Sequence, residues 1–203
     1  MTSVFLFDFD GVILDSFEDT YRRFKPVFDE LEIAFTKDTL RDLFLENVHA
    51  GASKFMTEEQ IQYLNEKTLN DIDITRLHLY DHIEVLLNEL ERKGELIIIS
   101  SNFEQHIKWS LEHHGVLPDV EILGHETHRS KVEKILSVKK RFPDANFVYV
   151  GDTVGDMREA TRAGVQSVAV TWGYHTREML QLAQPDYIVD TVEELRTVLS
   201  GLF

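Results

Sequence analysis

The sequence predicts a doubly wound α/β fold, in which helices cover both faces of a parallel sheet. Short apolar runs alternate with longer amphipathic segments along most of the chain. The runs lack polar alternation, which is typical of strands buried on both faces of a sheet. Gly94, Gly115 and Gly164 each follow an amphipathic segment, where a helix C-cap glycine belongs. This repetition of strand and helix indicates a parallel sheet with helical crossovers.

The predicted elements follow one another in a regular order. The first strand is Val4–Phe9, and the sequence then departs from the pattern until about residue 78. The later strands are Leu96–Ile99, Val120–Leu123, Phe147–Val150, Ser167–Val170 and Tyr187–Val189. The helices that accompany them are Asp81–Lys93, Glu104–His114, Lys131–Arg141, Asp156–Ala163, Arg177–Ala183 and Val192–Leu199.

The region from Phe17 to Leu77 shows only helical periodicity. Phe24, Val27 and Phe28 have the spacing of one helix face. Thr57 with Gln60 three residues later predicts an N-cap with a capping box. We therefore expect residues 16–77 to form a small helical unit inserted after the first strand, and residues 1–15 and 78–203 to form the sheet domain.

Composition limits the classes of partner. The 203 residues carry a formal net charge of −15, with 43% hydrophobic and 28% charged residues. Contacts with nucleic acid or an anionic membrane need clustered basic residues, so neither partner is expected. The chain has no cysteine, which excludes disulfides and metal thiolates and fits a reducing compartment.

The start of the chain resembles a strand, not a targeting segment. Met1, Thr2 and Ser3 provide no basic region. The longest apolar runs, such as Leu96–Ile99, are too short to cross a bilayer. We expect a soluble, cytoplasmic protein, and the sequence predicts no particular oligomeric state.

Reactive side chains stand where four predicted elements begin or end. Asp8, Asp10 and Gly11 follow the first strand, and Ser100, Ser101 and Asn102 follow the second. Lys131 stands near a helix start, and Asp152 and Asp156 follow a later strand. Because ligands of open α/β sheets bind outside the carboxyl ends of the strands, we expect these groups to share one pocket.

The aspartates in this set predict a divalent metal ion. Asp8 and Asp10 would face the same side if the strand persisted that far, and Asp152 would add charge from a neighbouring strand. Several adjacent carboxylates cannot all ionise without a cation, and Mg²⁺ accepts carboxylates, carbonyls and phosphate together. Zinc is disfavoured because the chain lacks cysteine and its nine histidines are scattered.

Four segments, "DFDGVILDS", "IIISSN", Lys131 and "GDTVGD", resemble the four motifs of the haloacid dehalogenase-like superfamily, in the order that family uses. The stretch beginning "VGDTVGDMREATRAG" is similar to its phosphoglycolate-phosphatase-like branch. The resemblance implies a Rossmann-like core, a helical cap over the active site, and a Mg²⁺-dependent phosphatase acting on a small phosphorylated metabolite.

The resemblance also implies roles for the acidic residues. Asp8 would be the nucleophile that forms an aspartyl-phosphate, and Asp10 the general acid and then base. Asp8, the Asp10 carbonyl and Asp152 would hold the metal. Asp156 would support the metal through water or orient Lys131.

The remaining motif residues would bind the phosphoryl oxygens. Ser101 would donate a hydrogen bond with help from the Asn102 backbone, and Lys131 would supply positive charge. The N–H groups of Gly11 and Val12 would bind the same oxygens. Two alternatives stay open: Ser100 for Ser101, and Arg129 for Lys131, because the family's Lys-Pro pair is Lys131-Val132 here.

Three other functions would use part of the same set of residues. A sugar phosphomutase would use the same residues. A phospho-acceptor signalling module also combines acids, Ser or Thr, and Lys, but it is smaller and needs no general acid beside its nucleophile. A dehalogenase would need neither Asp10 nor Asp152. Five side chains of the helical unit could reach an anionic substrate: Arg22, Arg23, Lys25, His49 and Lys54.

Overall fold

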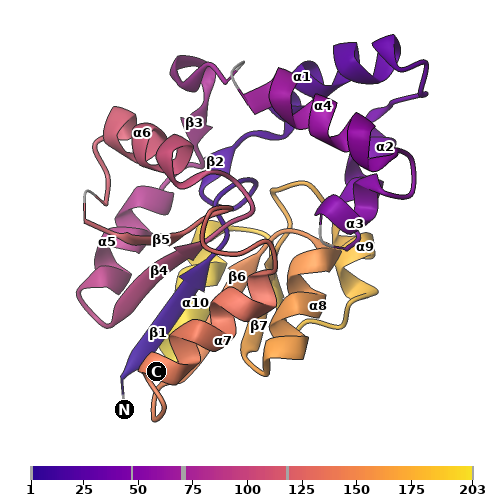
Figure 1. Ribbon diagram of the computed structural model, residues 1–203. Coiled ribbons are helices and arrows are strands. Elements are labelled where there is room, and N and C mark those ends of the chain that lie inside the picture. Colours follow the sequence, from indigo (N-terminus) through magenta and orange to yellow (C-terminus); the bar gives the residue numbers. More distant parts are fainter. Residues whose placement is uncertain (1, 47, 70–71, 118, 203) are drawn as a thin grey trace.

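A parallel six-stranded sheet forms the centre of the molecule. The computed structural model describes residues 2–46, 48–69, 72–117 and 119–202. The strand order is β5-β4-β1-β6-β7-β8, and every neighbouring pair is parallel. The strands are β1 (Ser3–Phe7), β4 (Glu95–Ile99), β5 (Glu121–Leu123), β6 (Asn146–Gly151), β7 (Gln166–Val170) and β8 (Tyr187–Val189). The prediction of a doubly wound, Rossmann-like α/β fold is confirmed (Figure 1).

Helices cover both faces of this sheet. Phe5 and Phe7 of β1 pack in a core with α5 (Ile83–Glu91), α6 (Glu104–His114) and α10 (Val192–Leu202). Val4 and Leu6 point to the opposite face, because successive strand residues alternate. There they pack with α7 (Lys131–Arg141), α8 (Val154–Ala163) and α9 (Arg177–Gln181). No helix within the described ranges is long and apolar enough to cross a membrane.

Several predicted boundaries differ from the structure. β1 ends at Phe7 rather than Phe9, because the chain turns there and Ile13 N–H donates to the Phe9 carbonyl (2.9 Å). α5 ends at Glu91, so Gly94 is not its C-cap residue. Gly94 instead allows a close backbone approach, since a Cβ there would lie 2.3 Å from the Ser3 carbonyl oxygen. Gly115 and Gly164 are left-handed C-cap residues, as predicted.

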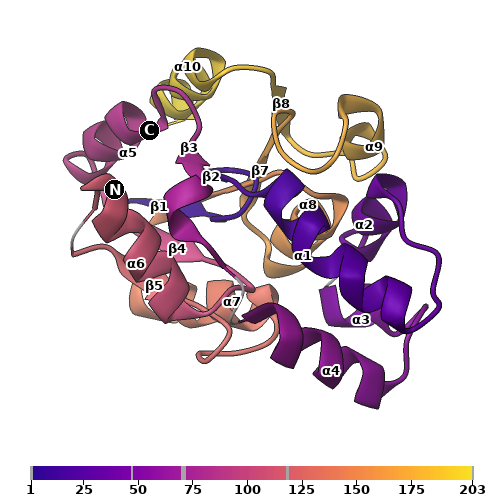
Figure 2. The same ribbon diagram turned by 90° about the horizontal axis from the view of Figure 1, so that it is seen from above.

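A helical insertion follows β1 in the sequence and lies over the carboxyl ends of the strands (Figures 1 and 2). It contains α1 (Phe17–Glu30), α2 (Lys37–Leu43), α3 (Val48–Ala52), α4 (Glu58–Leu69) and a short 3₁₀ turn (Ile74–Arg76). Phe28, Leu40 and Leu43 lie in its own apolar core. The predicted capping box before α4 is present: the Thr57 N–H donates to Gln60 Oε1 (2.9 Å) and the Gln60 N–H to Thr57 Oγ1 (3.3 Å).

The chain enters and leaves the insertion through a two-stranded antiparallel pair. β2 (Leu14–Asp15) pairs with β3 (His78–Leu79), with Leu14 opposite Leu79. The Tyr80 N–H continues the pairing to the Ile13 carbonyl (3.1 Å). This pair was not predicted, because two residues are too few to show a strand periodicity.

Candidate active site

Asp8 is the first residue after β1, and its buried side chain lines a pocket. Its N–H donates to the Val150 carbonyl (2.9 Å), which extends the sheet pairing by one residue. Its carboxylate accepts a hydrogen bond from the Phe9 N–H at Oδ1 (2.8 Å) and an ion pair from Lys131 Nζ at Oδ2 (2.7 Å). Both carboxylate oxygens are thus held in place by nearby groups.

Asp10 reaches the same pocket from the turn that follows, not from a strand. Its Oδ2 accepts a hydrogen bond from Asn102 Nδ2 (3.0 Å). Asp8 and Asp10 therefore lie in the same pocket, as predicted. A turn after β1 brings them together, whereas the sequence-based explanation was the alternation of side chains along a strand.

The same turn accounts for Gly11 and Val12. Gly11 has φ +77°, and a Cβ there would lie 2.0 Å from Asp152 Oδ2, so only glycine fits. The Gly11 N–H donates to the Leu14 carbonyl (2.8 Å), and the Val12 N–H contacts the Phe9 carbonyl at 3.4 Å. Neither residue is among those that line the pocket. The structure differs here from the prediction that these two N–H groups bind substrate, because closing the turn already uses them.

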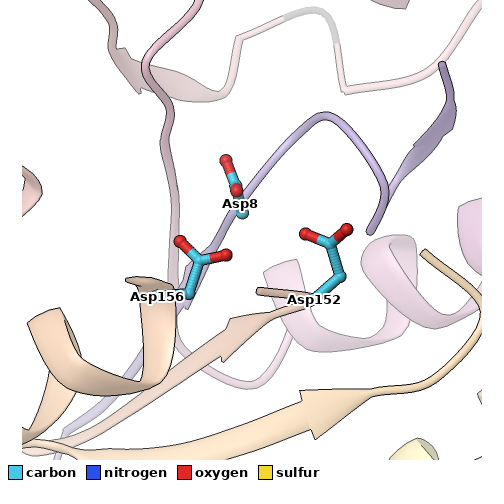
Figure 3. A group of neighbouring side chains, drawn as sticks. All are labelled: Asp8, Asp152 and Asp156. Atoms are coloured by element: carbon cyan, nitrogen blue, oxygen red, sulfur yellow. The ribbon is translucent and has the colours of Figure 1, made fainter. Parts of the chain in front are cut away.

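Three buried aspartates converge at one point: Asp8 follows β1, Asp152 follows β6, and Asp156 lies in the first turn of α8 (Figure 3). One carboxylate oxygen from each of Asp8, Asp152 and Asp156 lies within 4.8 Å of the others. Asp152 Oδ2 accepts the Tyr174 N–H (2.7 Å). Asp152 Oδ1 is buried and has no hydrogen-bond partner in the described part of the chain.

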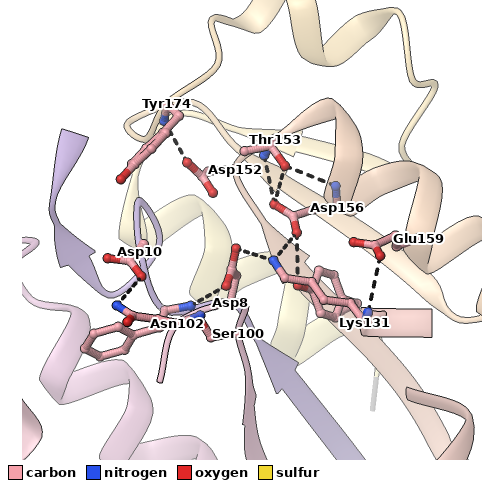
Figure 4. A network of polar contacts seen from close by, with 12 residues as sticks. Asp8, Asp10, Ser100, Asn102, Lys131, Asp152, Thr153, Asp156, Glu159 and Tyr174 are labelled. Carbon is pink, nitrogen blue, oxygen red and sulfur yellow. Dashed lines mark hydrogen bonds and ion pairs between the residues drawn. The ribbon is translucent and has the colours of Figure 1, made fainter. Parts of the chain in front are cut away.

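Asp156 is the most completely bonded of the three. Its Oδ1 accepts Lys131 Nζ (2.6 Å) and the Tyr149 hydroxyl (3.1 Å). Its Oδ2 accepts the N–H (3.1 Å) and hydroxyl (2.6 Å) of Thr153, the N-cap residue of α8. Figure 4 shows this network joining α7, α8 and the end of β1.

Burial and neighbouring charges give these three acids different pKa values. Burial raises the pKa of Asp8 to about 7, although Lys131 opposes the shift. Burial, together with the charges of Asp156 and Asp8, raises the pKa of Asp152 well above its usual range. Burial also opposes ionisation of Asp156, but the charge and hydrogen bonds of Lys131 outweigh it and lower that pKa. Asp156 therefore stays ionised as the partner of Lys131, whereas burial favours the protonated forms of Asp8 and Asp152.

The end of β4 supplies the second motif. Ser100 is buried, and its hydroxyl oxygen accepts the Asn102 N–H (3.0 Å). Ser100 and Ser101 both line the pocket, and the hydroxyl oxygen of Ser100 is the one already bonded to the Asn102 backbone. The Asn102 N–H, expected to bind substrate, is occupied by Ser100, and it is the Asn102 side chain that contacts Asp10.

The pocket has a volume of about 480 Å³, and the helical insertion forms one wall of it. Of the five basic residues considered in the insertion, only Arg23 and His49 line it. Arg23 has a side chain 10% exposed and donates to Asp19, the Thr68 carbonyl and Thr20. Arg22, by contrast, is 47% exposed. Arg129, the alternative to Lys131, also lines the pocket, but Lys131 is the residue that contacts Asp8.

Comparison with known proteins places this site in a family. The family model described as haloacid dehalogenase-like hydrolase matches residues 5–170, which contain every residue of the four motifs.

The chain belongs to the haloacid dehalogenase-like hydrolase family.

Relatives of this hydrolase match it over almost its whole length. The phosphoglycolate phosphatase of Synechococcus elongatus is 26% identical over 97% of both chains. The pyrophosphatase PpaX of Oceanobacillus iheyensis is 26% identical over 98% of this chain and 97% of its own. The chain is accordingly an enzyme, a phosphatase of the haloacid dehalogenase-like family.

Solved structures share the fold of this hydrolase. A hydrolase from Pseudomonas syringae superposes with a TM-score of 0.86 at 18% identity, covering 100% of this chain and 99% of its own. A haloacid dehalogenase-like family hydrolase from Streptococcus pneumoniae has a TM-score of 0.77 at 24% identity, covering 98% of both chains.

Sequence reasoning missed several residues around the site of this hydrolase. Thr153 could have been found, because a Thr three residues before Asp156 is a capping-box pattern. Tyr149 lies inside an apolar strand and gives no signal of its hydroxyl contact. Lys134 is followed by Lys139 and Lys140 on the same helix, which gives no signal that its own side chain is buried.

Proposed function

We propose that this enzyme is a Mg²⁺-dependent phosphatase that hydrolyses a small phosphomonoester through an aspartyl-phosphate on Asp8. The observation that carries the proposal is the Asp8 carboxylate itself. It is buried in the lining of a pocket, paired with Lys131, and has an oxygen within 4.8 Å of carboxylate oxygens of Asp152 and Asp156.

The acidic residues fit a hard divalent cation. Asp8, Asp152 and Asp156 each offer an oxygen, and Asp152 Oδ1 is a buried acceptor that lacks a partner among the described residues. All-oxygen ligands suit Mg²⁺. When bound, the ion would neutralise these acids and offset the repulsion between a carboxylate and a phosphoryl group.

The first step is attack by an Asp8 oxygen on phosphorus. A bond forms between that oxygen and phosphorus, and the bond from phosphorus to the ester oxygen breaks. The departing alcohol takes a proton from Asp10, whose carboxyl group Asn102 orients (3.0 Å). Water then attacks the aspartyl-phosphate, Asp10 takes its proton, and phosphate leaves with Asp8 restored.

The phosphoryl oxygens meet two pocket residues that are already in position. Lys131 Nζ is held between Asp8 and Asp156, so its charge is fixed where charge develops in the transition state. The Ser101 side chain lines the same pocket and can donate from its hydroxyl. We assign phosphoryl binding to these two residues, and we assign none to Gly11 or Val12.

We further propose that residues 16–77 form a cap that selects the substrate and excludes water during turnover. Arg23 and His49 place basic groups on the cap wall, and a pocket of about 480 Å³ suits a small metabolite. The relatives named phosphoglycolate phosphatase support a small phosphomonoester of that kind.

The test replaces Asp8 by asparagine, which keeps the size of the side chain but removes the nucleophile. We expect Asp8→Asn to lower Mg²⁺-dependent hydrolysis of p-nitrophenyl phosphate by at least about 10³-fold, because the covalent route is lost. Asp15→Asn, which changes an exposed aspartate on β2, is the matched control and should keep wild-type activity. Full activity in Asp8→Asn, or in wild-type enzyme treated with EDTA, would contradict the proposed chemistry.

A further inference from the structure

Lys134 is a buried lysine that the proposed chemistry does not use. It lies one helical turn after Lys131 on α7, and its side chain is 1% exposed. Lys131 has two carboxylate partners, whereas Lys134 forms no ion pair within the described residues. Burying an ammonium group without a carboxylate is costly, so its single contact calls for an explanation.

That contact is to the backbone beside the active site. Lys134 Nζ donates to the Ser100 carbonyl at 2.5 Å. Burial and the charge of Lys131 lower the pKa of Lys134 to about 8, while Asp8, Glu159 and Glu104 attract its charge. The ammonium group is thus aimed at the end of β4.

Every polar group of Ser100 is occupied by a different part of the structure. Its N–H donates to the Leu123 carbonyl (3.1 Å), its hydroxyl oxygen accepts the Asn102 N–H (3.0 Å), and its carbonyl accepts Lys134. Ser100 is therefore a fixed point from which the chain turns toward the pocket (Figure 4).

Asn102 connects Ser100 to Asp10. Its Oδ1 accepts the Phe103 N–H (2.8 Å), which orients the amide, and its Nδ2 donates to Asp10 Oδ2 (3.0 Å). Separate hydrogen bonds thus join Lys134 to the Ser100 carbonyl, the Ser100 hydroxyl to the Asn102 backbone, and the Asn102 side chain to the carboxyl group that handles the leaving-group proton.

We propose that Lys134 is a positioning residue, which holds the Ser100 carbonyl and thereby keeps Asn102 and Asp10 aligned to protonate the leaving group. This inference rests on the proposed function. Lys134 does not touch substrate, so its loss acts on proton transfer to the alcohol and only weakly on binding.

The experiment compares Lys134→Met with Lys134→Gln on two esters of nearly the same shape. Phenyl phosphate has a poor leaving group that needs a proton, and p-nitrophenyl phosphate has a good one that needs none. Because general acid catalysis supplies about 10²–10⁴-fold, we expect Lys134→Met to lower kcat about 30-fold on phenyl phosphate and less than about 3-fold on p-nitrophenyl phosphate. KM should change little. Lys134→Gln keeps an N–H donor for Ser100 and should stay within about 3-fold of wild type on both esters.

Two further variants serve as controls. Lys140→Met changes an exposed lysine on the same helix and should leave both rates unchanged. Asn102→Ala removes the hydrogen bond to Asp10 itself, so it should give the same dependence on the leaving group even if Lys134→Met folds poorly. Equal losses on both esters in Lys134→Met or Asn102→Ala would overturn the inference, as would a Lys134→Gln variant as impaired as Lys134→Met. A wild-type enzyme that hydrolyses neither ester in an Asp8-dependent way would instead overturn the proposed function.

Discussion

Lys131 and Lys134 stand one turn apart on α7, but their surroundings favour opposite protonation states. Burial disfavours the charge of Lys131, yet the charges of Asp156 and Asp8 outweigh it and raise its pKa. Lys134 has no such partner in the described structure, and burial with the charge of Lys131 lowers its pKa to about 8. Lys134 therefore weakens the folded state wherever it is protonated.

The stability cost of Lys134 should depend on pH. Below pH 8 the residue is protonated in both the folded and the unfolded state, so the full cost is present. Between pH 8 and the unfolded value of 10.5 the folded protein loses this proton first, and stability from this group rises with pH. We expect Lys134→Met to gain stability over wild type that is largest at pH 7 and smaller at pH 9.5. Urea unfolding at both pH values measures the difference, and a constant difference would contradict the lowered pKa.

Individual side chains were predictable where the sequence reveals both their type and their place. Asp8, Asp152 and Lys131 stand at element ends, and the structure brings all three together. The N–H groups of Gly11 and Val12 were not predictable, because their availability depends on how the turn closes. The partner of Asn102 was missed for the same reason: a contact between residues 92 positions apart leaves no local pattern.

At the scale of elements, the N-terminus of α8 is where the sheet domain meets the helical insertion. The Gly155 N–H donates to the Phe44 carbonyl (3.1 Å), and Arg158 donates to the Leu45 carbonyl (2.8 Å). Beside them, His175 accepts the Val154 N–H at Nδ1 (2.9 Å) and contacts the Arg41 carbonyl through Nε2 (2.9 Å). Because Nδ1 accepts a hydrogen bond, the imidazole is neutral and its proton is on Nε2.

Gly155 sets the distance between these two parts. A Cβ there would lie 2.6 Å from the Glu46 carbonyl oxygen and 2.9 Å from that of Phe44. We expect Gly155→Ala to destabilise the protein by about 1–3 kcal/mol, because the crowded atoms belong to the backbone. Thermal unfolding measures the change. Gly201→Ala on α10 meets no atom within 4 Å and should be neutral or stabilising, and equal effects of the two changes would rule out crowding as the cause.

Long periodic elements were predicted well, and short ones were not. α6 and α7 have the predicted bounds, because amphipathic spacing and flanking cap residues agree there. β2 and β3 contain two residues each and depend on pairing between distant segments. The arrangement of α1–α4 over the sheet likewise depends on contacts such as Gly155 to Phe44, which no single segment encodes.

At the scale of the molecule, an acidic chain concentrates buried carboxylates at one point. The net charge is −15, and burial raises the pKa values of both Asp8 and Asp152. Their mutual repulsion destabilises the metal-free protein when both are ionised. A cation bound there would relieve this repulsion and stabilise the entire fold.

Mg²⁺ should therefore raise the melting temperature. At a Mg²⁺ concentration of about ten times Kd the gain is about 1.4 kcal/mol, or roughly 3–6 °C for a chain of this size. Asp152→Asn should be more stable than wild type in EDTA and should lose the Mg²⁺-dependent gain. Differential scanning fluorimetry with NaCl at matched ionic strength separates binding from screening. An equal rise in melting temperature with NaCl in place of Mg²⁺, or with Mg²⁺ in the Asp152→Asn variant, would contradict a metal site formed by these acids.

The β2–β3 pair makes the fold modular. Leu14 pairs with Leu79 and Asp15 with His78, so the two ends of the 62-residue helical insertion (16–77) lie side by side in a fixed antiparallel register. Antiparallel strands can be joined by a loop of only two residues. The segment between β2 and β3 can thus be shortened, lengthened or replaced without moving β1 or Asp8. Substrate recognition can then change while the reacting groups keep their positions.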